Sequence, residues 1–451
     1  MLPELQTLRQ PASVVRLPSG QDVPLTQRVR RLLDTAPMRR LASISQLGMV
    51  PLVYPGATHS RMEHSLGVYH YALRLLDRFS DDPRFQDSTV AEEFLLAALL
   101  HDVGHWPYCH PIEDMQLPAL GEHEDRAQLW MGSGDVAACL DQEWDADAGS
   151  VARLLTVKPS ELSSETDPRS FARAFFASCL SGPIDVDKLD YLQRDSLHAG
   201  VPYGRNFDAQ RLVHSTVVHP DRPALAISEK GRTAAEMMVF ARYVMFSEVY
   251  WHHAVRSATA MLQRAVFLLQ HRMDLESSVR FTDSEWIASI QRMAEGSVAE
   301  PLVEGLFGVR RVLHKRLAEF DVIDGADIHQ KLSRRPYWWL VACAEKLAEN
   351  FSRAARIPVH AADVLIDAPP IKLEVDINID VVRRDGSVKP LGEMSPVASA
   401  LANQQFDQHV KRVRVFVRGD LRDALRAHFQ SNEDVAEALC RSIESIEEES
   451  S

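Results

Sequence analysis

The feature that most constrains this chain is a dense apolar segment that runs directly into a histidine and an aspartate. Residues 94–100 are all Phe, Leu or Ala; His101 and Asp102 follow at once, and Gly104 comes two positions later. An uninterrupted apolar stretch of this kind predicts a buried helix, and the glycine marks its end. Because regular helix geometry relaxes there, both His101 and Asp102 can direct their side chains towards one cation.

Two residues from other parts of the sequence complete a possible set of metal ligands. His64 lies in the first turn of a second predicted helix, and Asp187 lies near the start of a third. Two imidazoles and two carboxylates suit Mg²⁺, Mn²⁺, Fe²⁺, Ni²⁺ or Zn²⁺, and the sequence does not select one of these metals. Taken singly, His64 also fits a capping or surface histidine, and Asp187 a helix-start carboxylate. The ordered set of four favours a divalent-metal site.

The length and composition are those of a globular protein with a large core. The chain has 451 residues, of which 45% are hydrophobic and 25% are charged. A chain of this length is expected to form about two or three structural units. The apolar stretch is far shorter than a membrane span, and residues 1–19 lack the pattern of a signal peptide. We therefore expect no membrane association and a cytoplasmic location.

The charge and the cysteines narrow the classes of partner. The formal net charge of −13 disfavours broad binding to nucleic acid, which depends on a cationic surface. Nucleic acid is therefore a possible but not a favoured partner, whereas a small nucleotide held locally by Arg, Lys and metal is compatible with this charge. The five cysteines are odd in number and show no CxxC spacing, so neither a disulfide framework nor a zinc ribbon is predicted.

The hydrophobic patterns predict a mainly α fold with a small α+β lobe near the C-terminus. Residues 1–25 are Pro-rich and are expected to be irregular. Helical patterns extend over residues 26–355, and mixed helix and strand patterns over 356–430. Residues 431–451 are expected to form a helical end and an acidic tail.

Some elements within these ranges can be placed more closely. Alternating or apolar segments at 364–367, 372–382 and 413–417 predict strands of one small sheet. A continuous helical pattern extends over residues 232–272. The Ser-rich acidic stretch from residue 443 to the last residue is expected to be disordered.

Several motifs in collinear order resemble the HD phosphohydrolase superfamily, which takes its name from a histidine, a His-Asp pair and a later aspartate. These motifs lie at residues 33–35, 46–48, 54–57, 61–68, 101–110, 123–124 and 184–195. Together they resemble the deoxynucleoside triphosphate triphosphohydrolases, in the branch of the vertebrate enzyme with a sterile alpha motif and an HD domain. The sterile alpha motif has no counterpart here. The resemblance implies a helical HD phosphohydrolase domain over residues 26–355, with the four predicted ligands on the metal.

The resemblance also implies roles for other polar residues. His110, His123 and Glu124 would lie against the scissile phosphoester, with His105 beside them. All four lie in a Pro-containing region that is expected to be loop-like. Three cations from separate helices would hold the triphosphate: Arg61, Lys188 and Arg242. The sugar would meet Gln46, Leu47, Tyr191 and Asp195, and Tyr250 would crowd its C2′ position, which favours deoxyribose.

The chain departs from the family pattern at positions that bear on base recognition and regulation. Phe246 stands one turn before Tyr250, where the family has a histidine. Arg39 and Ala42 replace a Gln and an Arg of the vertebrate enzyme's regulatory nucleotide site. Since Ala42 cannot make a charge-assisted contact to phosphate, activation by dGTP or GTP is expected to be weak or to follow different rules.

Three classes of function are compatible with these observations. The favoured one is metal-dependent hydrolysis of a small nucleotide, a dNTP, to deoxynucleoside and inorganic triphosphate. A phosphodiesterase or nuclease for nucleic acid or signalling nucleotides could use the same metal ligands, although the acidic charge and Tyr250 argue against it. A non-catalytic nucleotide sensor is the third class, and the complete ligand set argues against it. We also expect a homo-oligomer, at least a dimer.

Overall fold

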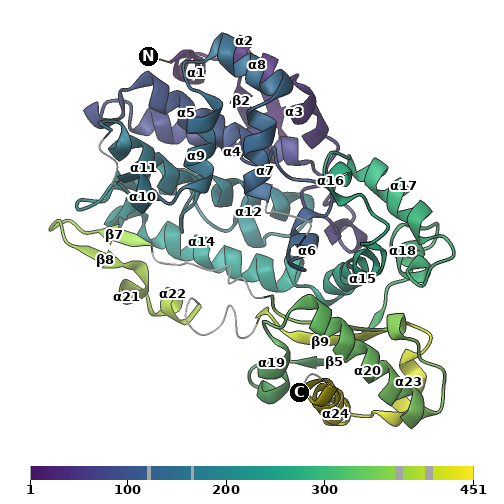
Figure 1. Cartoon of the computed structure of the whole chain (residues 1–451). Coiled ribbons are helices and arrows are strands. Elements are labelled where there is room, and N and C mark those ends of the chain that lie inside the picture. Colours follow the sequence, from purple (N-terminus) through teal and green to yellow (C-terminus); the bar gives the residue numbers. More distant parts are fainter. Residues whose placement is uncertain (1, 119–122, 164–166, 371–378, 402–409, 450–451) are drawn as a thin grey trace. The chain divides into compact units, whose positions relative to one another are not determined.

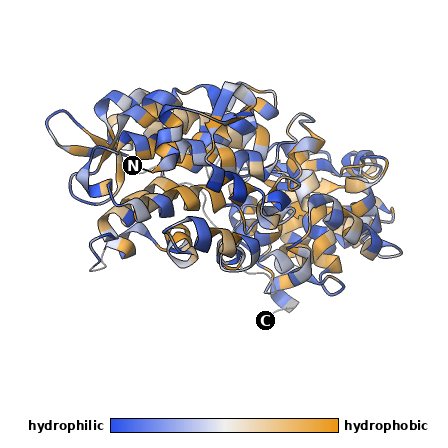
Figure 2. Cartoon of the chain, turned by 90° about the horizontal axis from the view of Figure 1, so that it is seen from above, coloured by the Kyte–Doolittle hydropathy of each residue, from blue (hydrophilic) through white to orange (hydrophobic). Residues whose placement is uncertain are grey.

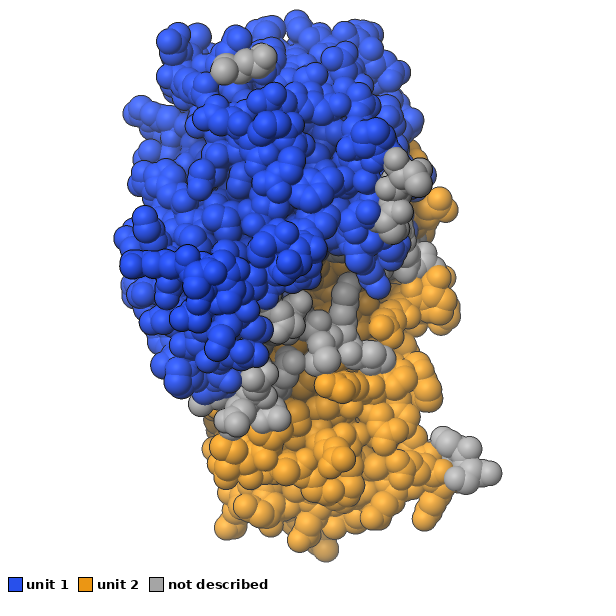
Figure 3. All heavy atoms as spheres, turned by 90° about the vertical axis from the view of Figure 1, so that its left-hand side faces the viewer, with its two compact units in different colours: residues 1–107, 121–245, 376–403 blue, residues 108–120, 246–375, 404–451 orange. Residues whose placement is uncertain are grey.

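The computed structural model describes residues 2–118, 123–163, 167–370, 379–401 and 410–449, and it is mainly helical (Figure 1). The mainly α fold with small sheets is therefore confirmed. The chain forms two compact units, each assembled from three separated stretches (Figure 3). Unit 1 comprises residues 1–107, 121–245 and 376–403, and unit 2 comprises residues 108–120, 246–375 and 404–451. The units do not follow the predicted ranges 26–355 and 356–430; as domain limits, those ranges stay a prediction.

Unit 1 is built mainly of helices that carry both polar and apolar residues along their length (Figure 2). Its helices are α1 (Pro3–Arg9), α2 (Gln27–Leu33), α3 (Ala36–Leu41), α4 (Arg61–Arg78), α5 (Ser88–Leu100), α7 (His123–Met131), α8 (Gly134–Glu143), α9 (Ala148–Thr156), α10 (Pro159–Ser163), α11 (Ser170–Leu180), α12 (Val186–His198), α13 (Ala209–Ser215), α14 (Arg232–Met245), α21 (Leu391–Met394) and α22 (Pro396–Ala400).

Helix α5 forms the centre of unit 1. Every residue from Val90 to Leu100 is buried, and apart from Glu92 and Glu93, which pair with Arg28 and Arg173, all of them are apolar. Asp87 caps its N-terminus by accepting a hydrogen bond from the backbone N–H of Val90 at 3.2 Å. Helix α4 packs against both α5 and α12 (Figure 1). The core therefore holds these three helices together, and it fixes the residues at their ends.

Unit 2 combines helices with a three-stranded sheet. Its helices are α6 (Cys109–Glu113), α15 (His253–Leu269), α16 (Leu275–Ser278), α17 (Asp283–Ala294), α18 (Glu300–Phe307), α19 (Ala326–Leu332), α20 (Tyr337–Ala355), α23 (Arg422–His428) and α24 (Asn432–Glu449). Residues from the sheet, α20 and α24 share one apolar core, in which Leu347, Val415 and Leu439 are buried. Within the described residues, no helix combines the length and the apolar character needed to cross a membrane.

The strands that the sequence predicts near the C-terminus belong to two sheets rather than to one. In unit 1 the order is β3-β4-β7-β8, from β3 (Thr216–Val218), β4 (Leu225–Ser228), β7 (Asp380–Val382) and β8 (Val388–Pro390). In unit 2 the order is β5-β9-β6, from β5 (Lys315–Phe320), β9 (Val413–Val417) and β6 (Val364–Asp367). The predicted strand 372–382 thus contributes β7 to unit 1, and its residues 372–378 lie outside the described residues.

Both ends of the chain are more ordered than predicted. Residues 1–25 contain α1 and a hairpin of β1 (Val14–Leu17) and β2 (Gln21–Pro24), so the expectation of an irregular segment is wrong. The predicted disorder from residue 443 is also wrong, since α24 continues to Glu449. Ile443 and Ile446 are buried in the core of unit 2, and this packing stabilises a helix end that its acidic composition disfavours.

The predicted helix over residues 232–272 is interrupted. Helix α14 ends at Met245, residues Phe246–Tyr250 form a π-helical turn, and α15 begins at His253. A π turn adds residues per turn. The prediction that Arg242, Phe246 and Tyr250, at i, i+4 and i+8, share one face of a regular helix therefore does not hold here.

Candidate metal centre

Three helix ends in unit 1 bring the four predicted ligands together. The ligands are His64 in the first turn of α4, His101 and Asp102 at the end of α5, and Asp187 in the first turn of α12. The side chains of Ser60 and Asp185 cap the starts of α4 and α12 by accepting backbone N–H groups. These caps fix where the two helices begin, and with that the positions of the ligands.

The ligand atoms converge closely. His64 Nε2 lies 3.3 Å from His101 Nε2 and 2.9 Å from Asp187 Oδ1. His101 Nε2 lies 3.3 Å from Asp102 Oδ1 and 3.9 Å from Asp187 Oδ1. One ligand atom from each of His64, His101 and Asp102 falls within 4.8 Å of the others. Imidazole nitrogens and carboxylate oxygens at this spacing are the donor set of a divalent transition metal or a partly hydrated Mg²⁺.

The second ring nitrogen of each histidine contacts an acceptor. His64 Nδ1 lies 2.8 Å from Asp190 Oδ2, and His101 Nδ1 lies 2.9 Å from the backbone carbonyl oxygen of Ala98. Each Nδ1 therefore carries a hydrogen and donates it, which makes Nε2 the nitrogen available for a metal in both rings. These residues fit a divalent cation by the chemistry of their donors and by the orientation of both imidazoles.

The electrostatics of the centre favour a positive charge at His64. Burial lowers the pKa of His64, but hydrogen bonds to Asp187 and Asp190 outweigh it and raise the pKa to about 10. Desolvation raises the pKa of Asp187, but the hydrogen bond and the charge of His64 outweigh this effect and lower that pKa to about 2. A proton on His64 Nε2 and a metal ion are therefore alternative positive charges at the same place.

Asp102 is held by two further cationic or donor groups. Arg61 Nη1 donates to Asp102 Oδ2 at 2.9 Å, and His105 Nε2 lies 3.0 Å from Asp102 Oδ1. All three residues are buried. Burial raises the pKa of Asp102, but the charges of His101, His105 and Arg61 hold that pKa well below its usual range. The structure thus places Arg61 and His105 on a predicted metal ligand.

Other predicted phosphate-binding residues gather along α12 and α14. Lys188 Nζ donates to Asp185 Oδ2 at 2.5 Å. Burial raises the pKa of Tyr191 to about 12 against the opposing charges of Arg242 and Lys188. Since α12 contacts α14, the cations Lys188 and Arg242 lie close to each other and to the carboxylates of Asp185 and Asp187.

The predicted sugar-binding residues of unit 1 lie near the start of α4. The backbone N–H of Gln46 donates to the carbonyl of His59 at 3.0 Å, so Gln46 and the adjacent Leu47 run beside the segment that leads into α4. Asp195 is buried on α12, and its Oδ1 lies 2.9 Å from Nε2 of His59. His59 therefore connects the Gln46 segment with α12.

Four predicted site residues are not placed in this cluster. His110 and Tyr250 belong to unit 2, and the side chain of His110 is 61% exposed with its Nδ1 3.7 Å from Glu113 Oε2. His123 opens α7, but the side chains of His123 and Glu124 lie outside the described part of the structure. The expected loop-like region is wrong at these positions, because His110 lies in α6 and His123 in α7.

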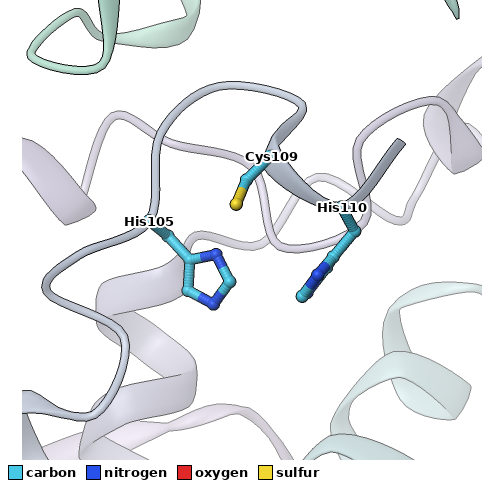
Figure 4. A group of neighbouring side chains, drawn as sticks. All are labelled: His105, Cys109 and His110. Atoms are coloured by element: carbon cyan, nitrogen blue, oxygen red, sulfur yellow. The ribbon is translucent and has the colours of Figure 1, made fainter. Parts of the chain in front are cut away.

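Figure 4 shows His105, Cys109 and His110, which come from the segment after α5 and the first turn of α6. The boundary between the two units falls within this segment, between Pro107 and Tyr108.

The sequence analysis did not predict the residues that hold the ligand His64 in place. Asp190 contacts His64, and Arg194 contacts Asp190. The spacing offered a signal, because Asp187, Asp190 and Arg194 are at i, i+3 and i+7 and therefore share one face of α12.

The fold and the centre define a helical protein with two histidines and two aspartates arranged to hold a divalent cation. Residues 61–129 match the HD domain, and residues 207–438 match the HD associated region. The chain belongs to the family of proteins that combine an HD domain with an HD-associated region.

Several relatives extend over much of the chain. An uncharacterized protein of Methanocaldococcus jannaschii is 28% identical over 393 residues, 86% of this chain and 76% of the relative. An uncharacterized protein of Bacillus subtilis is 35% identical over 235 residues, 52% of this chain and 50% of the relative. A deoxynucleoside triphosphate triphosphohydrolase homolog of Dictyostelium discoideum is 30% identical over 243 residues, 52% of this chain and 45% of the relative. The matches to the last two thus span about half of each protein.

Solved structures share the fold. A hypothetical protein from Aquifex aeolicus superimposes with a TM-score of 0.71 at 25% identity, covering 92% of this chain and 99% of that one. A phosphohydrolase from Bacteroides thetaiotaomicron superimposes with a TM-score of 0.67 at 21% identity, covering 90% and 99%.

Proposed function

We propose that this protein is a metal-dependent phosphohydrolase that converts a dNTP to deoxynucleoside and inorganic triphosphate. The observation that carries the proposal is the convergence of two imidazole Nε2 atoms and two carboxylates, with each Nδ1 held by an acceptor. The similarity to triphosphohydrolases of Dictyostelium discoideum and vertebrates, at 28–30% identity over about half of this chain, supports the choice of substrate.

His64, His101, Asp102 and Asp187 would hold the cation, which when bound polarises a phosphoryl oxygen and lowers the pKa of a coordinated water. Arg61 and His105 keep Asp102 ionised and oriented. Lys188 and Arg242 supply positive charge beside this centre, and they are proposed to hold the triphosphate together with Arg61.

Histidines are proposed to carry the proton transfers. His105 lies within the centre, and its contact with Asp102 orients its ring. His110, His123 and Glu124 are proposed to meet the scissile phosphoester, where a group with a pKa near neutrality can protonate a leaving oxygen. We also propose that Gln46, Leu47, Tyr191 and Asp195 meet the sugar and that Tyr250 limits the space at C2′.

The test is a product analysis. Purified protein with Mn²⁺ or Mg²⁺ is incubated with each dNTP singly and in mixture, and the products are separated by chromatography. Inorganic triphosphate and deoxynucleoside in equal amounts are the expected products. Release of pyrophosphate and a deoxynucleoside monophosphate would instead show cleavage between the α- and β-phosphates and contradict the proposal. Binding without turnover would point to a nucleotide sensor.

A further inference from the structure

We infer that Asp190 is a positioning residue that holds the metal ligand His64 and that is itself held by Arg194. This inference rests on the metal centre of the proposed function and extends it to residues that touch neither metal nor substrate. Asp190 is 2% exposed and follows Asp187 by one turn of α12. Its Oδ2 lies 2.8 Å from Nδ1 of His64, on the side of the ring away from the other ligands.

Arg194 fixes the Asp190 carboxylate with two hydrogen bonds. Its Nε donates to Asp190 Oδ2 at 2.8 Å and its Nη2 to Asp190 Oδ1 at 2.6 Å. Its Nη1 donates to Glu63 Oε1 at 2.8 Å, and Glu63 directly precedes His64 on α4. The contacts therefore close a ring from His64 through Asp190, Arg194 and Glu63 back to α4. A buried charged network with paired members resists rotation of each of its groups.

A glycine on α4 makes room for this network. Gly67 lies one turn after His64, and a Cβ at this position would come within 1.9 Å of Asp190 Oδ1 and 2.4 Å of Arg194 Nη2. Both contacts are far below the van der Waals distance, so any larger residue would displace the buried pair. The missing side chain at Gly67 of α4 therefore leaves the space that Asp190 and Arg194 of α12 occupy.

The two ligand histidines are supported differently. His101 donates from Nδ1 to a neutral carbonyl, whereas His64 donates to a carboxylate. A carboxylate partner increases the basicity of the imidazole and fixes its orientation, and the loss of such a partner typically weakens metal binding by about 10- to 100-fold. Asp190 therefore strengthens His64 as a ligand in addition to orienting it.

The experiment measures metal binding without any substrate. Metal-free protein is titrated with Co²⁺, and both the dissociation constant and the visible absorption spectrum are recorded. We expect Asp190→Asn to weaken binding by about 10- to 100-fold and to change the Co²⁺ spectrum. Gly67→Ala is expected to act in the same direction, because it moves the Asp190 carboxylate without altering any charge. If Asp190→Asn does not fold, the Co²⁺ affinity of Gly67→Ala tests the inference.

Asp195→Asn is the matched control. Asp195 lies on the same helix, is also 2% exposed and also contacts an imidazole, that of His59, which is not a predicted ligand. Its substitution should leave the Co²⁺ affinity and spectrum unchanged. Folded Asp190→Asn or Gly67→Ala protein that binds Co²⁺ like the unmodified protein would overturn the inference, as would an unmodified protein that binds no Co²⁺. An unmodified protein that binds metal but cleaves no dNTP would refute only the proposed substrate.

Discussion

Asp187 is the outermost of the four predicted ligands. Its side chain is 35% exposed, whereas that of His64 is 1% exposed. Substitution of Asp187 therefore removes a ligand with little loss of packing, while substitution of His64 would open the core. We expect Asp187→Ala to lose the divalent metal and the hydrolytic activity but to keep its helical content.

Metal content by mass spectrometry, activity and circular dichroism check this prediction together. Full activity in metal-depleted Asp187→Ala would contradict the assignment of the ligand. Loss of the helical signal would instead assign Asp187 a structural role.

Sugar selection is a second prediction at this scale. If Tyr250 crowds C2′, the additional hydroxyl of a ribonucleotide has neither space nor a partner, which costs on the order of 1–3 kcal/mol. The unmodified protein should therefore cleave dATP much faster than ATP, and Tyr250→Ala should narrow this difference. Comparison of kcat/KM for the two nucleotides measures the effect, and equal values for the unmodified protein would contradict the role of Tyr250.

The four residues that converge at the candidate metal centre could be predicted from the sequence because they stand out locally. His101 and Asp102 follow an apolar helix, and His64 and Asp187 each lie in the first turn of another. The role of Asp190 was harder to predict. Its spacing from Asp187 places both residues on one face of α12, but the contact of Asp190 with His64 depends on the packing of α12 against α4, which leaves no local pattern.

At the scale of elements, one carboxylate joins two strands of unit 2. Glu319 on β5 stands directly opposite Arg414 on β9, and the Arg414 Nε donates to Glu319 Oε2 at 2.7 Å. Arg412 and Arg316 also donate to Glu319, at 2.6 Å and 2.8 Å. Burial raises the pKa of Glu319, but these arginines outweigh it and lower the pKa to about 2. The carboxylate is thus more acidic in the folded protein than in the unfolded chain.

This shift predicts a pH-dependent contribution to stability. Because the folded pKa lies below the unfolded value of 4.5, the contribution is complete above pH 4.5 and is lost as the pH falls towards 2. Glu319→Gln should lower the free energy of unfolding at pH 7 by roughly 3 kcal/mol and flatten its decline between those pH values. Urea titrations at a series of pH values test this, and an identical pH dependence in both proteins would contradict it.

Strand pairing was the part of the fold that the sequence did not reveal. The segments at 364–367 and 413–417 have the residues of strands and form β6 and β9. Their neighbour β5 was not predicted, because a register shift between Arg316 and Ala318 breaks its alternation. The assignment of β7 to another sheet depends on a pairing with β4, which is distant in the sequence and leaves no local pattern.

At the scale of the whole molecule, assembly and regulation can be tested together. By resemblance to the vertebrate enzyme, Arg39 and Ala42 stand where a Gln and an Arg would be, and Ala42 cannot make a charge-assisted contact to a phosphate. We expect a homo-oligomer whose mass does not change with added nucleotide, and whose rate on one pure dNTP is not raised severalfold by GTP. Light scattering and single-substrate rates measure both quantities. A monomer that assembles only with dGTP or GTP would contradict this prediction.

The parallel pairing of β4 with β7 has a consequence for biosynthesis. Ile227 pairs with Val381, so the partner of β4 leaves the ribosome about 150 residues later, which takes on the order of ten seconds at typical rates of translation. During that interval one edge of the hairpin β3–β4 has no neighbour in the nascent chain and is open to pairing with other strands. Unit 1 can be completed only after most of unit 2 has been synthesised. The yield of folded protein should therefore depend on chaperones that shield nascent chains, more than it would for a protein whose sheets pair in sequence order.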